Sequence, residues 1–190
     1  MLEQVSLRLR APRTKGFEVL RDIVPAEARE AALRHVHLHV LRHGLPPDEL
    51  GSWLWSAHWF PHLKWDAPIV GLLDHLPARL RDGELCDPQI LLQLPDEAEE
   101  VALEPHVDQE PEWAGGRRYA RIVGVALSPG RATNGGLVVW PLDGVEPEPE
   151  PVEVEPGDVV VMDPALPHTS GLNREGGIRY AVYFRFLETP

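Results

Sequence analysis

The chain has 190 residues, of which 43% are hydrophobic, so it can bury one good core and is short for two. Its formal net charge of -12 argues against a polyanionic partner, because nucleic acids and anionic membrane surfaces are bound mainly through clustered lysine and arginine. We therefore expect a single domain over residues 1–190 that binds neither nucleic acid nor a membrane.

The N-terminal segment, residues 1–20, has no continuous apolar stretch of signal-peptide length. No apolar run elsewhere approaches the ~20 residues that span a bilayer, so we expect a cytoplasmic protein. The single cysteine, Cys86, rules out an internal disulfide and a cysteine-based zinc site. Because no basic residue adjoins Cys86 to activate it as a nucleophile, we interpret it as a core residue.

The N-terminal part, residues 1–85, is predicted to be mainly helical. Residues 25–44 combine a proline near the first turn, an alanine-rich composition, apolar residues on one face and a closing glycine. Residues 48–60 and 68–80 suggest two more helices, with prolines between them.

From residue 88 onward the pattern changes to short segments rich in β-branched and aromatic residues, separated by Pro, Gly, Asn and Asp. Five segments are predicted to be strands: residues 88–94, 118–128, 135–141, 152–163 and 178–188. So many short strands in one half of the chain favour an antiparallel sandwich or barrel. The helices are then expected to pack against one outer face.

Residues 145–151 alternate valine or proline with glutamate. Proline removes hydrogen-bond donors from a strand ladder and the carboxylates repel one another, so this segment is predicted to be an extended, solvated loop. Such a charged hairpin tip discourages pairing with the edge of another sheet.

A histidine and an acid two residues apart, His106 and Asp108, lie in an acidic, proline-bounded stretch. In extended backbone, residues i and i+2 point to the same side, so the two side chains can converge on one point. The pair by itself is weak evidence for a metal site, because such pairs are common.

A third ligand is available in the C-terminal segment, where a turn at residues 156–158 and a short apolar strand are followed by His168. Two imidazoles and one carboxylate on one face of a metal leave the other positions open, an arrangement that suits Fe(II) and oxygen chemistry. A structural zinc site would instead use four protein ligands. The set His106, Asp108 and His168 therefore favours an open, reactive metal site.

Arg179 is the second residue of the last predicted strand, 178–188, and shares one strand face with Ala181, Tyr183 and Arg185. An arginine facing the inside of a barrel requires an anion, because a buried guanidinium without a partner is destabilising by several kcal/mol. A carboxylate of a bound ligand, held by two parallel hydrogen bonds, would satisfy it.

These residues together resemble the Fe(II)/2-oxoglutarate dioxygenases of the phytanoyl-CoA dioxygenase type. The resemblance covers residues 86–188 and rests on the His-x-Asp pair, the later histidine and an arginine eleven residues beyond it. It also includes the turn at Gly157 and Asp158 and the turn at residues 134–136.

The resemblance implies a double-stranded β-helix, or jelly roll, with iron held by His106, Asp108 and His168 and with 2-oxoglutarate as co-substrate. It implies that Arg179 binds the distal carboxylate of 2-oxoglutarate. It further implies that Ser170 assists Arg179, and that Gln93 and Gln89 contact 2-oxoglutarate unless they are ordinary polar residues of the strand.

The same resemblance implies the reaction class. Halogenating members of the family lack the metal carboxylate, so Asp108 favours hydroxylation of a small-molecule substrate by dioxygen, or a related desaturation or ring formation. Succinate and carbon dioxide are then released. Neither the substrate nor the oligomeric state follows from these patterns.

Two other classes of function remain open at this point. A cupin-like isomerase, hydrolase or lyase uses the same barrel with a divalent metal and no 2-oxoglutarate. Arg179 discriminates between the two classes of enzyme, because such an enzyme does not need an anion clamp. A ligand-binding protein without catalysis could retain the same residues.

Further candidates for function come from histidine and tryptophan. Three histidines, His35, His39 and His43, recur every four residues, a spacing that can bind metal on a helix, but no carboxylate nearby in sequence completes such a site. Residues 53–65 are rich in tryptophan and could pack helices on the sheet, line a substrate channel or form a dimer contact. Trp113 and Trp140 are nearer to the proposed metal and are candidates for substrate contact.

Overall fold

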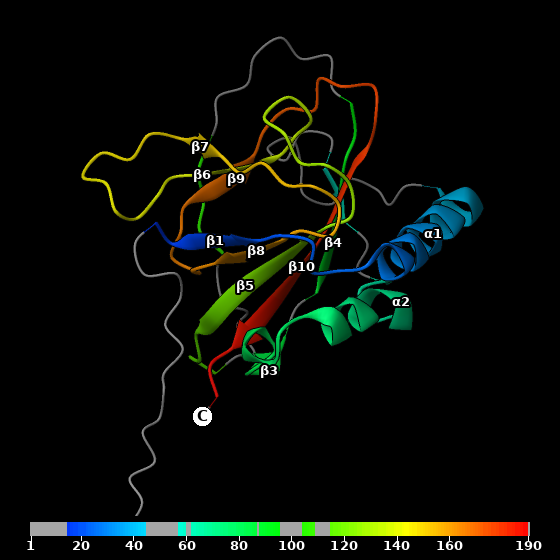
Figure 1. Ribbon diagram of the computed structural model, residues 1–190, viewed down its shortest axis with the longest axis horizontal. Helices are drawn as coiled ribbons and strands as arrows, with labels where there is room; N and C mark the ends of the chain where they lie inside the picture. Colours follow the sequence, from blue (N-terminus) through cyan, green and yellow to red (C-terminus); the bar gives the residue numbers. More distant parts are fainter. Residues whose placement is uncertain are drawn as a thin grey trace, which may run out of the picture.

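A computed structural model describes residues 15–44, 57–59, 62–86, 88–95, 104–108 and 115–189 of the chain. Two antiparallel sheets make up the body of the protein (Figure 1). The strands of the larger sheet are β1 Phe17–Leu20, β2 Ala57–Trp59, β3 Glu84–Leu85, β4 Gln89–Gln93, β5 Tyr119–Ala126, β8 Val159–Met162 and β10 Arg179–Leu187. Those of the smaller sheet are β6 Leu137–Val139, β7 Glu150–Pro151 and β9 His168–Ser170.

The strand order gives a jelly roll, as the resemblance implied. The larger sheet has the order β1-β8-β5-β10-β4-β2, with β3 paired to β10, and the smaller has the order β7-β6-β9. One apolar core lies between the two sheets and includes Leu137 and Val139 of β6 with Ala181 of β10. The interior of the barrel is therefore filled from both sheets, and the remaining space is left to the polar residues described below.

The helices cover the other face of the larger sheet (Figure 1). Helix α1, Ala26–His43, is followed by the short helix α2, Ala67–Val70, and by 3-10 helices at Gly71–His75 and Ala78–Leu80. A second core joins buried helical residues such as Val36 and Ile69 to the outer face of the sheet. This confirms the predicted position of the helices.

Strand β10 lies between β5 and β4 and separates the two cores. Its side chains alternate, so that Val182, Phe184 and Phe186 belong to the core under the helices, whereas Ala181 and Tyr183 face the smaller sheet. This is the alternation that the sequence predicts, and it places Arg179 and Arg185 on the interior side.

The five predicted strands are present with shorter bounds, most of all residues 152–163, of which Val159–Met162 form β8; other strands were not predicted. β1 pairs with β8, and the turn at Gly157 holds it there: the Asp158 carboxylate accepts hydrogen bonds from the Asp22 amide at 2.9 Å and from Arg21 Nη1 at 2.6 Å. Residues 57–59, within the predicted helix 48–60, form β2 on the edge strand β4 instead. Pairing with an open sheet edge outweighs local helical preference there. The first 85 residues thus supply three strands as well as the helices.

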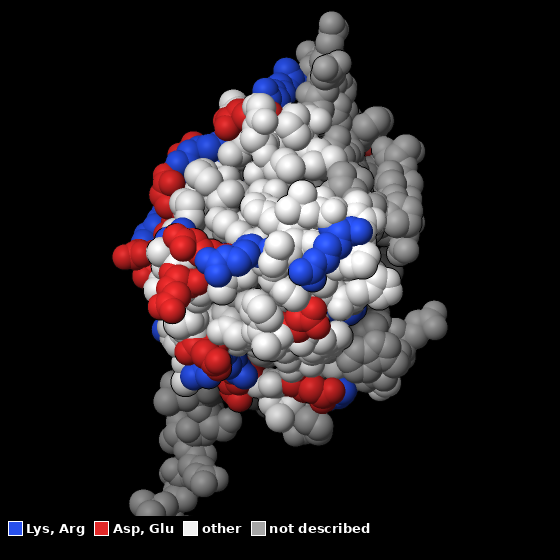
Figure 2. Space-filling model, turned by 90° about the vertical axis from the view of Figure 1, so that its right-hand side faces the viewer, with Lys and Arg blue, Asp and Glu red and all other residues white. Residues whose placement is uncertain are grey.

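Residues 145–149 of the predicted loop are exposed, as predicted, and the end of the segment, Glu150–Pro151, forms β7 against β6. Figure 2 shows the side of the molecule that carries the helices, where the described lysine and arginine residues are mixed with aspartate and glutamate and form no continuous basic patch on this face. No helix in the described ranges combines the length and the apolar character required to cross a bilayer.

Candidate metal and anion site

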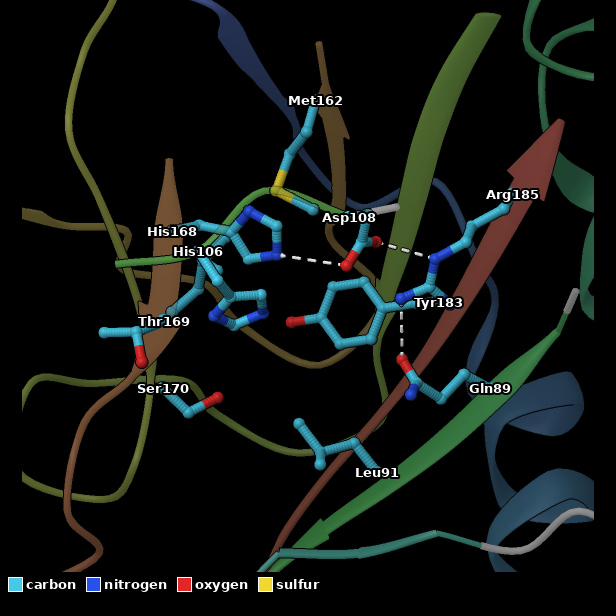
Figure 3. Close-up of a pocket in the computed structure, with 11 residues that line it drawn as sticks. Gln89, Leu91, His106, Asp108, Met162, His168, Thr169, Ser170, Tyr183 and Arg185 are labelled. Atoms are coloured by element: carbon cyan, nitrogen blue, oxygen red, sulfur yellow. Dashed lines mark hydrogen bonds and ion pairs between the residues drawn. The ribbon is translucent and has the colours of Figure 1, made fainter. Parts of the chain in front are cut away.

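Three predicted ligands, His106, Asp108 and His168, meet in one pocket between the sheets (Figure 3). One potential ligand atom from each lies within 4.8 Å of the others. The backbone explains the convergence, because His106 and His168 form an isolated antiparallel bridge with amide-to-carbonyl bonds of 3.0 and 2.9 Å in the two directions. β9 is paired in turn with β6, so the smaller sheet carries both histidines.

The ring of His168 is oriented for ligation by its own backbone. Its Nδ1 lies 2.9 Å from the carbonyl oxygen of Leu166, and because a carbonyl only accepts, Nδ1 carries the proton. The lone pair is then on Nε2, which lies 3.8 Å from Asp108 Oδ1. A metal-binding histidine commonly has this second hydrogen bond, which fixes tautomer and ring orientation.

Asp108 is held from the opposite side by Arg185, a residue for which the sequence had given no role. Arg185 Nε donates to Asp108 Oδ2 at 2.6 Å, and its Nη2 donates to Gln89 Oε1 at 3.0 Å (Figure 3). Oδ1 is thereby left toward the histidines. The signal for Arg185 was present in the alternation of the last strand, but its partner lies 77 residues away and no spacing indicates it.

Asp108 and His106 both have the protonation state that is required of a metal ligand. Burial alone would raise the pKa of Asp108, but the charge and hydrogen bond of Arg185, with help from the histidines, lower it below its usual value. Burial lowers the pKa of His106, and the neighbouring His168 lowers it further, against the opposite effect of Asp108. At neutral pH the site therefore presents a carboxylate and a neutral imidazole.

Arg179 is a second charged group in the barrel, and it is only 4% exposed. Its Nη1 donates to the Gly135 carbonyl at 2.9 Å and its Nη2 to the Tyr183 hydroxyl at 3.2 Å. No carboxylate reaches it in the part of the chain that the structure describes. A buried guanidinium bonded only to neutral oxygens is an unbalanced positive charge, and an anion from outside the chain would balance it.

The other predicted residues around 2-oxoglutarate occupy different positions. Ser170 and Gln89 line the pocket, whereas Gln93 is paired with Arg179 across β4 and β10 and is 2% exposed. The Gln93 side chain packs on Gly135, where an added Cβ would lie 2.3 Å from its Cγ. Within the described residues, no hydrogen bond joins Ser170 to Arg179.

The remaining histidine and tryptophan candidates lie outside this pocket or outside the described residues. His35 Nε2 lies 2.8 Å from Asp66 Oδ2, a carboxylate that the spacing of the histidines in the sequence did not indicate. Among the described residues, the only cluster with the geometry of a metal site is the triad of His106, Asp108 and His168. Trp140 is partly buried and does not line the pocket, and Trp65 is exposed. Trp113 and residues 53–56, 60 and 61 of the tryptophan-rich segment lie outside the described residues.

Comparison with known proteins supports the resemblance. The family model of phytanoyl-CoA dioxygenase matches residues 145–181, which include His168 and Arg179. No curated protein matches the chain in sequence at a significant level.

Solved structures match nearly the whole chain. The carbocyclase SnoK from nogalamycin biosynthesis, described as non-heme and alpha-ketoglutarate dependent, is 15% identical, with a TM-score of 0.66 over 92% of this chain and 80% of that one. HygX from Streptomyces hygroscopicus, solved with nickel, 2-oxoglutarate and hygromycin B, is 18% identical, with a TM-score of 0.67 over 93% and 84%. A prolyl-4-hydroxylase from Pseudomonas putida is 20% identical, with a TM-score of 0.61 over 93% and 94%. The chain therefore has the double-stranded β-helix fold of these oxygenases.

Proposed function

We propose that this protein is an Fe(II)- and 2-oxoglutarate-dependent dioxygenase that hydroxylates a small molecule. One observation carries the proposal: a two-histidine, one-carboxylate cluster and a buried arginine without a carboxylate lie in the same barrel. The first is a ligand set for iron, and the second is a binding site for an anion. Few chemistries require both together.

The residues fit the metal. His106 and His168 offer neutral nitrogen and Asp108 offers one carboxylate oxygen, with its other oxygen occupied by Arg185. Such a set leaves metal positions open for a co-substrate and for dioxygen. When bound there, iron supplies the activation of dioxygen that amino-acid side chains cannot provide.

The residues also fit 2-oxoglutarate, which has a carboxylate at each end. Arg179 would bind the distal carboxylate, and Ser170 and Gln93 remain proposed contacts on the strength of the resemblance. The Arg179 side chain reaches Tyr183, which lines the pocket of the triad. A molecule held by Arg179 would thus extend toward the metal ligands.

The reaction consumes the substrate, dioxygen and 2-oxoglutarate and releases the hydroxylated substrate, succinate and carbon dioxide. Asp108 favours hydroxylation over halogenation, because a halogenating site needs the position of the carboxylate for the halide. The structural neighbours include a carbocyclase and an epimerase, so related outcomes on the same fold belong to the test. A cupin-like enzyme without 2-oxoglutarate would provide no anion to balance the buried charge of Arg179.

The test is an anaerobic titration of the metal-free protein with Fe(II) and then 2-oxoglutarate, in which the visible iron-to-ketoacid charge-transfer band is recorded. We expect a band for the native protein and none for His168→Ala. We expect Arg179→Met to need far more 2-oxoglutarate to reach the same band. His75→Ala and Arg117→Met, which change an exposed histidine and a surface arginine paired with Glu84, are the matched controls.

If iron binds and no band forms at any 2-oxoglutarate concentration, the dioxygenase proposal fails and the cupin-like class takes its place. If the band forms, aerobic release of succinate in the presence of candidate small molecules identifies the substrate class.

A further inference from the structure

A second group of imidazoles and a carboxylate lies in the helical layer, outside the pocket of the triad. Three histidines of helix α1, His35, His39 and His43, follow one another at intervals of four residues. Residues four apart lie on the same face of a helix, and two histidines at this spacing are a recurrent zinc-binding pattern. The sequence around these histidines offers no carboxylate to complete such a site, and the fold supplies one in Asp66.

Asp66 precedes helix α2 in a turn that is held by buried and backbone contacts. The Leu63 side chain is buried in the core under the helices, and the Asp66 amide donates to the Leu63 carbonyl at 2.9 Å. An aspartate that begins a helix commonly accepts a hydrogen bond from the first amides of that helix, but the Asp66 side chain makes no such bond. Its carboxylate is directed to helix α1 instead, where Oδ2 lies 2.8 Å from His35 Nε2.

His39 lies at the centre of this group. Its ring centroid is 4.8 Å from that of His43. The pKa of His39 is lowered first by burial and then by three neighbouring histidines, against the opposite effect of Asp66. The three are His43, His35 and His62. His39 is therefore within electrostatic reach of three imidazoles and one carboxylate, and it favours the neutral form that binds a metal.

The contact between His35 and Asp66 has nearly the spacing of two ligands on one ion. Zinc binds nitrogen and oxygen at about 2.0 to 2.2 Å in tetrahedral geometry, so two of its ligand atoms lie about 3.3 Å apart. A small rotation of either side chain opens the observed 2.8 Å to this value. The two side chains are 32% and 45% exposed, so an ion can enter from solvent. His39 has to turn toward the pair, because among the described residues only the triad already gathers three ligand atoms within 4.8 Å.

We propose that His35, His39 and Asp66 bind a divalent cation, Zn(II), Ni(II) or Cu(II), as a second metal site outside the barrel. His43 and His62 are near enough to His39 to complete the coordination. Imidazole nitrogen suits these three ions, which bind such ligands more tightly than Fe(II) does. The bound ion joins helix α1 to the turn before α2, close to the C-terminal end of α1, where the helix dipole favours positive charge. This site does not depend on the proposed function.

The test counts zinc bound to the metal-free protein by equilibrium dialysis and measures its affinity by isothermal titration calorimetry. We expect the native chain to hold one more Zn(II) than His39→Ala, whether or not the triad also takes zinc. In a His168→Ala background, where the triad lacks a ligand, one Zn(II) should remain, and the addition of His39→Ala should remove it. Asp66→Asn keeps the size of the side chain and removes its charge. It should weaken this zinc by about tenfold or more, since even residues behind the ligands change metal affinity by about 10- to 100-fold.

Two substitutions are matched controls. His37→Ala changes a histidine of the same helix whose Nε2 lies 3.0 Å from the Tyr180 hydroxyl instead. Asp74→Asn changes an exposed aspartate of the same helical layer. Both should leave the zinc content unchanged. Because alanine is a strong helix former, His39→Ala is expected to keep helix α1, which circular dichroism checks.

Equal zinc content and affinity in the native protein and in His39→Ala overturn the proposal. So does a zinc content that falls to zero in His168→Ala, because all bound zinc would then be at the triad. A loss of the same size in His37→Ala also overturns it, because zinc would then bind exposed histidines in general. Failure of the titration with Fe(II) and 2-oxoglutarate would instead overturn the proposed function and leave this site intact.

Discussion

Arg185 and Asp108 form an ion pair at 2.6 Å in which each side chain is only 10 to 11% exposed. Arg185→Met keeps much of the side-chain volume and removes the charge. Breaking a buried pair from one side leaves an uncompensated charge and costs about 3 to 5 kcal/mol of unfolding free energy. The lost hydrogen bond to Gln89 adds about 1 kcal/mol.

The losses of unfolding free energy caused by Arg185→Met and by a substitution of Asp108 should not add. Asp108→Leu alone leaves Arg185 without this carboxylate and is expected to cost a similar amount. The double variant, Arg185→Met with Asp108→Leu, removes both charges, and replacing a buried pair with apolar residues is often nearly neutral. We therefore expect the double variant to be more stable than either single variant, with a coupling energy of about 3 kcal/mol or more.

The assay is urea unfolding of the metal-free proteins, followed by circular dichroism and tryptophan fluorescence. Arg117 and Glu84 form a pair of the same 2.6 Å length with far greater exposure, and the same cycle there should give a coupling of less than about 1 kcal/mol. If the Arg185 and Asp108 losses simply sum, the carboxylate is not held by Arg185 and the account of the ligand geometry fails.

Three further outcomes are expected. Burial alone would raise the pKa of Asp158, but hydrogen bonds from two backbone amides and from an arginine lower this pKa below 3.8. The ionised carboxylate therefore stabilises the fold above about that pH. This contribution to stability is lost as the pH falls through the folded-state pKa. Asp158→Asn should therefore lose about 1.5 to 3 kcal/mol in urea unfolding at neutral pH, with a gap to the native protein that narrows in acid; a constant gap would contradict this. Gly135→Ala, at φ +78° with an added Cβ 2.3 Å from a neighbouring side chain, should lower the melting temperature, whereas Gly176→Ala, with open space around it, should not. Added Fe(II) or Ni(II) should raise the melting temperature of the native protein, and chelation should reverse this; a full rise in His168→Ala would place the metal elsewhere.

The sequence predicted the features that depend on local pattern. Alternation along the last strand assigned Arg179 and Tyr183 to the interior face, and the spacing of His106, Asp108 and His168 indicated a metal site that the structure assembles. These predictions succeed because strand period and residue chemistry are properties of a few neighbouring residues.

Other features depend on which segments become neighbours. Residues 57–59 were predicted to be helical but pair with β4, and β1, which was not predicted, pairs with β8. Local sequence preference did not indicate either pairing, because the open sheet edge exists only in the folded chain. The partner of Arg185 was equally hidden, because Asp108 reaches it across 77 residues. Hence the sequence alone determined the faces of the strands and the kinds of ligand. Only the tertiary structure decided the partners, because hydrogen bonds and ion pairs between distant residues exist only after the sheets have closed.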